Sequence, residues 1–182
     1  MTRRTRSWST RPPTTRRLLL SLFGALILAL TVVLHRYGPQ RSPVATASLP
    51  SSAVVTRVID GDTVELADGR RVRYLGIDTP ELRKRVGQSW VYAPEPFAEA
   101  AAAANRTLVE GRTVRLEYDA RPYDRYNRLL AYIYVGETFV NAELLARGLA
   151  RVLIIPPNVR HAEECEALQR QARQQRAGMW GR

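Results

Sequence analysis

Three short segments of this 182-residue chain carry charged side chains in an order that could perform chemistry. Residues 60–63 (DGDT) lie between two short runs that are typical of strands. Residues 78–81 (DTPE) follow the strand-like segment that contains Arg73, and Arg128 opens a strongly apolar strand. Taken singly, each has an ordinary interpretation: a turn, a capped loop, and an arginine at the solvent-exposed rim.

The acidic side chains together indicate a site for a hard cation. Ca²⁺ takes several oxygen ligands from carboxylates, carbonyls and water. If a hairpin brings Asp62 beside Asp78, two carboxylates converge, and such close like charges are unfavourable unless a cation lies between them. We therefore predict that Asp62 and Asp78 hold a metal ion.

The arginines and the glutamate supply the other parts of a metal-assisted phosphodiester cleavage. The planar guanidinium group matches two phosphate oxygens at once, so Arg73 and Arg128 suit a phosphate whose charge grows in the transition state. Glu81 could accept a proton from water. Acids for a metal, two arginines and a proton acceptor together predict hydrolysis of a phosphodiester.

The elements that must position these residues are short β-branched runs and amphipathic segments. The sequence predicts five strands, at 53–60, 63–67, 71–77, 113–118 and 128–135, and a further one at 150–155. It predicts helices at 94–111, 141–148 and about 158–176. Five strands with a helix inserted after the third predict an α+β domain, a five-stranded OB-fold β-barrel with three helices.

For four residues we predict a specific position within these elements. We predict that Gly61 lets the chain change direction and that Asn141 caps the N-terminus of the second helix. His161 is expected to be a surface residue at the start of the last helix. Cys165, the one cysteine of the chain, is expected in the core, and it excludes an intrachain disulfide and a cysteine-based metal cluster.

The first 52 residues differ in composition from the rest of the chain. Residues 1–17 are basic and rich in Ser, Thr and Pro, which predicts a disordered cytoplasmic tail. Residues 18–34 contain no charge, and seventeen apolar residues reach the lower limit for a bilayer span, so we predict an N-terminal transmembrane helix. A Pro- and Ser-containing linker, 35–52, would connect this anchor to the domain at 53–180.

The orientation of this anchor follows from its flanking charges. Six arginines precede the apolar run and two follow it closely, which favours a cytoplasmic N-terminus and a domain outside the cytoplasm, periplasmic or extracellular. A signal peptide cleaved near Ala47, which would release a secreted domain, and an ordinary core helix are the alternatives. Signal peptides usually have a shorter apolar core, of about 7–15 residues.

The net charge of +11 belongs mostly to the N-terminal tail. Residues 1–47 contain eight arginines and no acid, so residues 48–182 keep 20 basic and 17 acidic side chains, a balance of +3. Charge alone is therefore weak support for a nucleic-acid partner.

Four segments closely resemble the staphylococcal nuclease (thermonuclease) family. They are VIDGDTVEL (58–66), RYLGIDTPE (73–81), YDRYNRLLAYIYV (123–135) and FVNAELLARGLARV (139–152), in family order and at family spacing, and the likeness covers roughly residues 53–180. The resemblance implies an OB-fold, calcium-dependent nuclease that acts on DNA and RNA. Such an enzyme cuts the 5′-oxygen–phosphorus bond and leaves 3′-phosphates; no obligate protein partner is implied.

The resemblance also implies which residues bind the metal. Asp62 and Asp78 would bind Ca²⁺ through their carboxylates, and Thr79 would add its backbone carbonyl. Asp60 corresponds to a nearby acid of the family that tunes the site without necessarily binding the ion.

The catalytic and substrate-binding residues follow from the same motifs. Glu81 would position or deprotonate the attacking water. Arg73 and Arg128 would hold the scissile phosphate and stabilise its pentavalent transition state. Arg125 and Tyr126 match the family's basic–aromatic pair, and Tyr126 could stack on a base.

Two segments depart from the family pattern. Residues 151–158 (RVLIIPPN) contain no tyrosine where the family has tyrosines that contact the nucleotide. Residues 82–96 match the family's mobile basic loop only in position. Two further functions remain open: an OB-fold module that binds nucleic acid or protein without cutting, and a purely structural domain at the membrane. The complete set of acids and arginines favours the enzyme.

Overall fold

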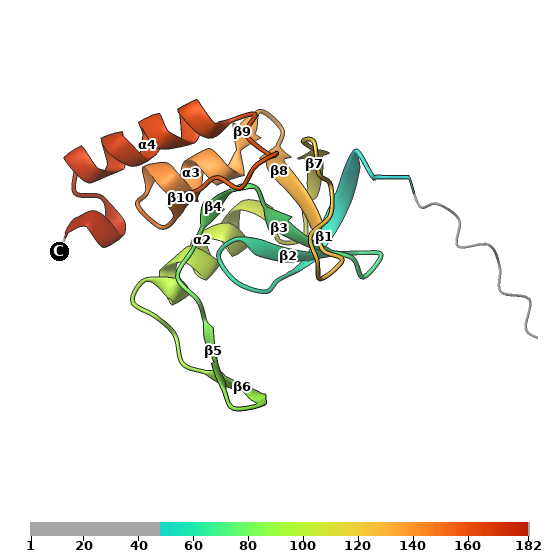
Figure 1. The fold of residues 1–182 in the computed structure, drawn as a ribbon, viewed down its shortest axis with the longest axis horizontal. Helices are drawn as coiled ribbons and strands as arrows, with labels where there is room; N and C mark the ends of the chain where they lie inside the picture. Colours follow the sequence, from blue (N-terminus) through green and yellow to red (C-terminus); the bar gives the residue numbers. More distant parts are fainter. Residues whose placement is uncertain (1–47, 182) are drawn as a thin grey trace, which may run out of the picture. The chain divides into compact units, whose positions relative to one another are not determined.

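The computed structural model describes residues 48–181, and its central feature is a closed β-barrel (Figure 1). Strand β1 pairs with β2 and β7, β2 pairs with β3, and β7 pairs with β8, all antiparallel. A parallel pairing of β3 with β8 closes the barrel, which confirms the predicted five-stranded barrel. The barrel strands are β1 (Ser52–Val58), β2 (Thr63–Leu66), β3 (Arg71–Tyr74), β7 (Thr113–Glu117) and β8 (Leu129–Val135).

The interior of the barrel is apolar because strands such as β2 and β3 direct apolar side chains to one face. Val64 and Leu66 of β2 are buried, as are Val72 and Tyr74 of β3, whereas Arg71 is exposed. Since successive side chains of a strand point to opposite faces, this alternation fills the barrel interior with apolar groups. A short strand, β9 (Thr138–Phe139), continues the sheet beside β8.

Three α-helices accompany the barrel, as predicted: α2 (Ala98–Val109), α3 (Val140–Ala146) and α4 (Ala162–Gln174), followed by the 3₁₀ turn η1 (Gly178–Gly181). Helix α2 buries Ala98, Ala101 and Ala102, and such small side chains allow it to lie close to the barrel. Cys165 of α4 is buried, as expected. Helix α4 begins at Ala162 rather than near residue 158.

Asn141 has a different position from the predicted helix cap. Helix α3 begins at Val140, so Asn141 lies inside its first turn and is fully buried. Its amide oxygen accepts a hydrogen bond from the backbone N–H of Ile133 (3.0 Å), and its amide nitrogen donates to the carbonyl of Leu75 (2.8 Å). The buried amide is satisfied on both sides, and it ties β8 to the chain that leads into β4.

Two further strands lie next to the charged segment that follows β3. Strand β4 (Gly76–Asp78) pairs antiparallel with β10 (Arg151–Leu153), and the register sets Asp78 opposite Arg151. Segments more than seventy residues apart in the chain therefore meet at the end of β4. Asp78 is the last residue of that strand, which fixes where its carboxylate lies.

Residues 83–92 form a hairpin that no pattern in the sequence predicted. Strands β5 (Arg83–Val86) and β6 (Ser89–Tyr92) pair antiparallel around a turn at Gly87, and Figure 1 shows the hairpin extending away from the barrel. All eight of its strand residues are exposed. No core pattern marks such a hairpin in the sequence, because neither face packs on the barrel.

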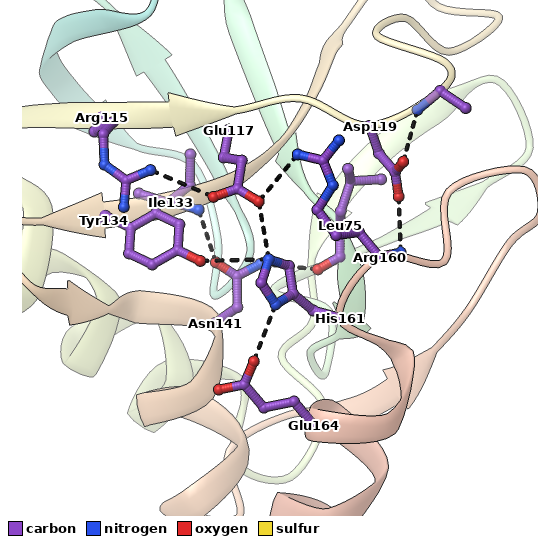
Figure 2. Close-up of polar contacts among 11 residues, drawn as sticks. Leu75, Arg115, Glu117, Asp119, Ile133, Tyr134, Asn141, Arg160, His161 and Glu164 are labelled. Atoms are coloured by element: carbon purple, nitrogen blue, oxygen red, sulfur yellow. Dashed lines mark hydrogen bonds and ion pairs between the residues drawn. The ribbon is translucent and has the colours of Figure 1, made fainter.

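His161 lies at the start of α4, as predicted, but it is more than a surface residue, because its partly exposed side chain joins this helix to the barrel (Figure 2). Its side chain is 20% exposed, with Nε2 2.9 Å from an oxygen of Glu117 on β7 and Nδ1 3.0 Å from an oxygen of Glu164 on α4. The imidazole also meets the ring of Tyr132 edge-on, with 4.6 Å between ring centroids. These contacts hold the start of α4 against β7 and β8.

The predicted tail (1–17) and transmembrane helix (18–34) lie outside the described residues, as does most of the linker. Among residues 48–181, no helix combines the length and the apolar character that crossing a bilayer requires.

Candidate active site

Asp62 is a fully buried carboxylate in the loop that connects β1 and β2. Its Oδ2 atom accepts two hydrogen bonds from Thr79, one from the backbone N–H (2.8 Å) and one from the hydroxyl group (3.0 Å). The role of Thr79 in orienting Asp62 was not foreseen from the sequence. It joins the DGDT and DTPE segments into one structure.

Gly61 allows these two segments to approach each other. A Cβ atom on residue 61 would lie 2.6 Å from Oγ1 of Thr79 and 2.8 Å from Cβ of Ala101. Both distances are shorter than van der Waals contact. The requirement for glycine at this position is therefore lack of space between Thr79 and helix α2, rather than the freedom to turn that the sequence suggested.

Arg73 lies between the two predicted metal-binding carboxylates. Cross-strand pairing sets it opposite Thr63, next to Asp62. Its Nη1 donates to Oδ1 of Asp62, and its Nη2 donates to Oδ1 of Asp78 over 2.5 Å. The structure thus brings Asp62 and Asp78 to one guanidinium group, as their predicted convergence requires.

Burial controls the electrostatics of this group. Burial raises the pKa of Asp62 above its ordinary value, against the opposing effect of the positive charge of Arg73. Partial burial, followed by the charge of Asp60, also raises the pKa of Glu81. Both carboxyls are therefore stronger bases than free ones, and a cation placed beside Asp62 would favour its charged form.

The donor chemistry fits a hard divalent cation. Asp62 and Asp78 each direct an oxygen to the same positively charged group, and oxygen ligands are what Ca²⁺ prefers. Within residues 48–181, no three carboxylate, histidine or cysteine side chains are grouped as a metal cluster. A site here would therefore combine two carboxylates with backbone carbonyls and water.

Asp60 takes a supporting position beside Asp62. Its Oδ1 atom accepts the backbone N–H of Asp62 (3.2 Å), and its backbone carbonyl accepts a bond from Nδ2 of Asn105 (3.3 Å). Asn105 is a buried residue of α2, and it also accepts a bond from the hydroxyl group of Tyr74. Helix α2 therefore holds the acidic loop, which the sequence did not indicate.

Arg128 is held by a tight turn in front of β8. Asp124 accepts the backbone N–H groups of Tyr126 (2.8 Å) and Arg128 (2.9 Å), and its second oxygen accepts Nε of Arg128 (2.7 Å). Asn127 completes the turn with a φ of 61°, a conformation that Asn tolerates well. Asp124 was not singled out from the sequence, although an Asp that opens a turn is a recognisable signal.

Two clefts meet at these residues. The first, of about 800 Å³, is lined by basic side chains such as Arg125 and by apolar ones such as Leu153 and Ile155. The second, of about 820 Å³, is lined in part by Arg83 and Trp90 of the hairpin. Both clefts are lined by Arg73 and Arg128, which we assigned to the phosphate, and by Glu81, which we assigned to the attacking water. They also share one aromatic residue, Tyr126.

Tyr126 and Arg125 form an exposed basic–aromatic surface in the first cleft. The Tyr126 side chain is 65% exposed, and the guanidinium of Arg125 lies 4.8 Å from its ring centroid. The segment 151–158 contributes no tyrosine to this cleft; Leu153, Ile155 and a Pro-Pro pair line it instead. The sequence indicated this segment only through the absence of the family's tyrosines.

Comparison with known proteins gives a consistent result. Residues 71–182 match the family model described as staphylococcal nuclease homologue. The chain is 36% identical over 167 residues to a thermonuclease of Staphylococcus intermedius, covering 87% of this chain and 96% of that protein. It is 32% identical to a thermonuclease of Staphylococcus hyicus, covering 89% and 95%. It is 35% identical over 136 residues to endonuclease YncB of Bacillus subtilis, covering 72% of this chain and 62% of that protein.

Proposed function

The chain belongs to the staphylococcal nuclease family, and from this premise we propose that it is a calcium-dependent nuclease that hydrolyses phosphodiester bonds of DNA and RNA. The observation that carries the proposal is the meeting of Asp62 and Asp78 on Arg73, at clefts that Glu81 and Arg128 also line. The nuclease activities named for the relatives support it.

The carboxylates of Asp62 and Asp78 and the backbone carbonyl of Thr79 would hold Ca²⁺. The bound ion would supply positive charge to a phosphate oxygen and lower the pKa of a nearby water. Thr79 would serve twice, because its N–H and hydroxyl group already fix the orientation of Asp62. Asp60 would act on the site through its charge and through its bond to the backbone of Asp62.

Glu81 would position or deprotonate the water that attacks phosphorus. A general base works best when its pKa approaches the working pH, and the raised pKa of Glu81 favours this role. In-line attack opposite the 5′-oxygen would break the 5′-oxygen–phosphorus bond and leave a 3′-phosphate. The proton would pass from water to Glu81, and the leaving 5′-oxygen would be protonated by solvent.

Arg73 and Arg128 would stabilise the charge that develops on the phosphate. Both terminal nitrogens of Arg73 bond Asp62 and Asp78, so a cation that takes these carboxylates would release them for the phosphate. Arg128 is anchored by Asp124 through its Nε atom. A donor that is already in position loses little energy to reorganisation when the charge appears. Arg125 and Tyr126 would bind the neighbouring nucleotide in the first cleft.

The direct test is cleavage of an end-labelled single-stranded DNA by the purified full-length protein, with Ca²⁺ or with a chelator. We expect cleavage only with Ca²⁺, and fragments that a polymerase extends only after their 3′-phosphates have been removed. Binding of the DNA without cleavage would show a non-catalytic binding module and contradict the proposal.

A pair of variants separates catalysis from folding. Glu81→Gln should reduce kcat by about 10²–10⁴-fold while DNA binding in chelator is retained, because only the proton acceptor is lost. Glu95→Gln is the matched control, since Glu95 accepts the backbone N–H of Glu81 at the base of the hairpin (3.3 Å). Its kcat should stay within a few-fold of the unchanged protein.

We further propose that residues 18–34 anchor the protein in a membrane with the nuclease domain outside the cytoplasm. The support for this is the uncharged run and its flanking arginines. Mass spectrometry of the mature protein distinguishes the two fates of the N-terminus. Retention of the whole chain supports the anchor, whereas a mature N-terminus just after Ala47 would show a cleaved signal and a secreted enzyme.

A further inference from the structure

The β5–β6 hairpin gathers two arginines and two aromatic side chains on one of its faces. Its register pairs Arg83 with Tyr92 and Arg85 with Trp90. Residues directly opposite each other in an antiparallel pair share a face, and every second residue along a strand returns to that face. The other face carries the remaining pairs, Lys84 with Val91 and Val86 with Ser89.

The arginine–aromatic face is turned toward the active site. Arg83 and Trp90 both line the second cleft, which also contains Arg73, Glu81 and Arg128. Trp90 is 64% exposed, so its indole ring is largely available to a ligand. Arg83 forms no ion pair with any other residue of the described part of the chain.

The base of the hairpin is attached directly to Glu81. The N–H of Glu95 donates to the carbonyl of Glu81 (2.9 Å), and the N–H of Ala93 donates to the carbonyl of Leu82 (3.2 Å). The hydroxyl group of Tyr92 bonds to Glu99 on α2. Because bonds on both sides fix its base, the hairpin presents Trp90 at a set position relative to the catalytic groups.

We propose that this hairpin face is a second nucleotide subsite for single-stranded nucleic acid, in which Trp90 stacks on a base and Arg83 contacts the backbone phosphate. The subsite lies in the second cleft, so the strand would occupy both clefts, with the scissile phosphate at the residues that they share. The inference rests on the proposed function for the identity of its ligand.

The chemistry of the second cleft favours a single strand. Its lining contains five arginines and two acids: Arg70, Arg71, Arg73, Arg83 and Arg128, with Asp60 and Glu81. Four of these arginines are paired with acids, so Arg83 is the arginine of this lining whose charge is left for a phosphate. A positively charged groove that follows the backbone, with an aromatic ring on which a base can stack, is the arrangement that binds unpaired strands. In a duplex the base faces are covered by their neighbours, so Trp90 would have nothing to stack on.

A membrane is the other ligand that exposed tryptophan and arginine could suggest. A membrane-binding hairpin would present these side chains away from the active site, toward a flat surface. Here Trp90 and Arg83 line the same cleft as Arg73 and Arg128. The placement therefore favours nucleic acid.

The test measures binding of fluorescein-labelled thymidine oligonucleotides to the full-length protein in chelator, where no cleavage occurs. We expect Trp90→Ala to weaken binding of an octanucleotide about tenfold, the scale of one lost stacking contact. A dinucleotide fits in the first cleft alone, so its affinity should change less than twofold. Trp90→Phe should restore most of the octanucleotide affinity, because it keeps an aromatic ring.

Val91→Ala is the matched control, since Val91 lies next to Trp90 on the opposite face of the same hairpin. It should bind both oligonucleotides normally. An unchanged octanucleotide affinity in Trp90→Ala would overturn the subsite. Loss of binding to phosphatidylglycerol vesicles by Trp90→Ala, with normal octanucleotide binding, would also overturn it, because the hairpin would then serve the membrane. If the effect of Trp90 on binding is present while the unchanged protein fails to cut with Ca²⁺, the subsite stands and the proposed nuclease function fails.

Discussion

At the residue scale, Arg128 shows how a neighbouring carboxylate orients a single side chain. Asp124 accepts both its backbone N–H and its Nε, so one face of the guanidinium group is fixed by a carboxylate. Asp124 bonds neither of the two terminal guanidinium nitrogens, and Arg128 lines both clefts. Partial burial raises the pKa of Asp124, but the backbone N–H and the guanidinium of Arg128 outweigh it and hold that pKa below its usual value. The anchor thus stays charged at neutral pH.

At this scale we predict that Arg128→Lys lowers kcat by about 10²-fold or more, because a lysine cannot bond Asp124 and offer the phosphate two parallel donors at once. The measurement is single-turnover cleavage of labelled DNA with Ca²⁺. Arg147→Lys is the matched control: Arg147 also pairs with an acid four residues away, Glu143, but on the exposed side of α3. Near-normal rates in Arg128→Lys would refute the phosphate-binding role.

The close contact between the acidic loop and helix α2 is the decisive feature at the scale of elements. Ala101 of α2 and Thr79 after β4 both lie against Gly61, and Asn105 of α2 bonds the carbonyl of Asp60. A helix that is inserted between β6 and β7 in the sequence therefore holds the loop between β1 and β2. The small side chain of Ala101 has its reason here, because a larger one would not fit beside Gly61.

For this contact we predict that Gly61→Ala destabilises the protein by about 1–3 kcal/mol, the usual cost of overpacking. It should also slow Ca²⁺-dependent cleavage at least tenfold, because the added methyl group displaces Thr79 from Asp62. Thermal unfolding and the cleavage rate provide the two measurements.

Gly69→Ala is the comparison. Its φ of 81° disfavours alanine, by about 1 kcal/mol, but no atom lies within 4 Å of the new Cβ. It should lose stability and keep the cleavage rate. If Gly61→Ala also keeps the rate, the close contact does not position the site.

At the scale of the whole molecule, the cluster around Glu117 connects the C-terminal helix to the barrel (Figure 2). Partial burial raises the pKa of Glu117, but hydrogen bonds from His161 and Arg160, and then from Arg115, outweigh it and lower that pKa below its ordinary value. The charged form is thus stabilised by folding. Helix α4 in turn packs near β10, which sets Arg151 opposite Asp78.

A pH dependence follows from this cluster. Since the folded pKa of Glu117 is lower than its unfolded value, the ionised group contributes stability above about pH 4.5, the ordinary value of a glutamate. This contribution is lost as the pH falls through the folded pKa. Glu117→Gln should therefore cost about 1 kcal/mol at pH 7 and progressively less below pH 4.5.

Thermal unfolding between pH 3 and pH 7 measures this difference. Glu137→Gln is the control, because Glu137 lies in the exposed turn between β8 and β9 and forms no ion pair within residues 48–181. Its unfolding temperature should follow that of the unchanged protein at every pH. A constant difference between Glu117→Gln and the unchanged protein across this range would contradict the linkage.

The sequence by itself determined the barrel, the helices and the identity of the charged groups, because alternating β-branched runs, glycine turns and spaced acids are local signals. It could not determine that Thr79 orients Asp62, that Asn141 bridges β8 and the start of β4, or that His161 holds α4 to β7. Each of these contacts joins segments far apart in the chain, and several depend on burial, which only the packed core creates. The hairpin is the clearest case. Its residues show no core pattern, so only the tertiary structure decides that Arg83 and Trp90 line a cleft with Arg73.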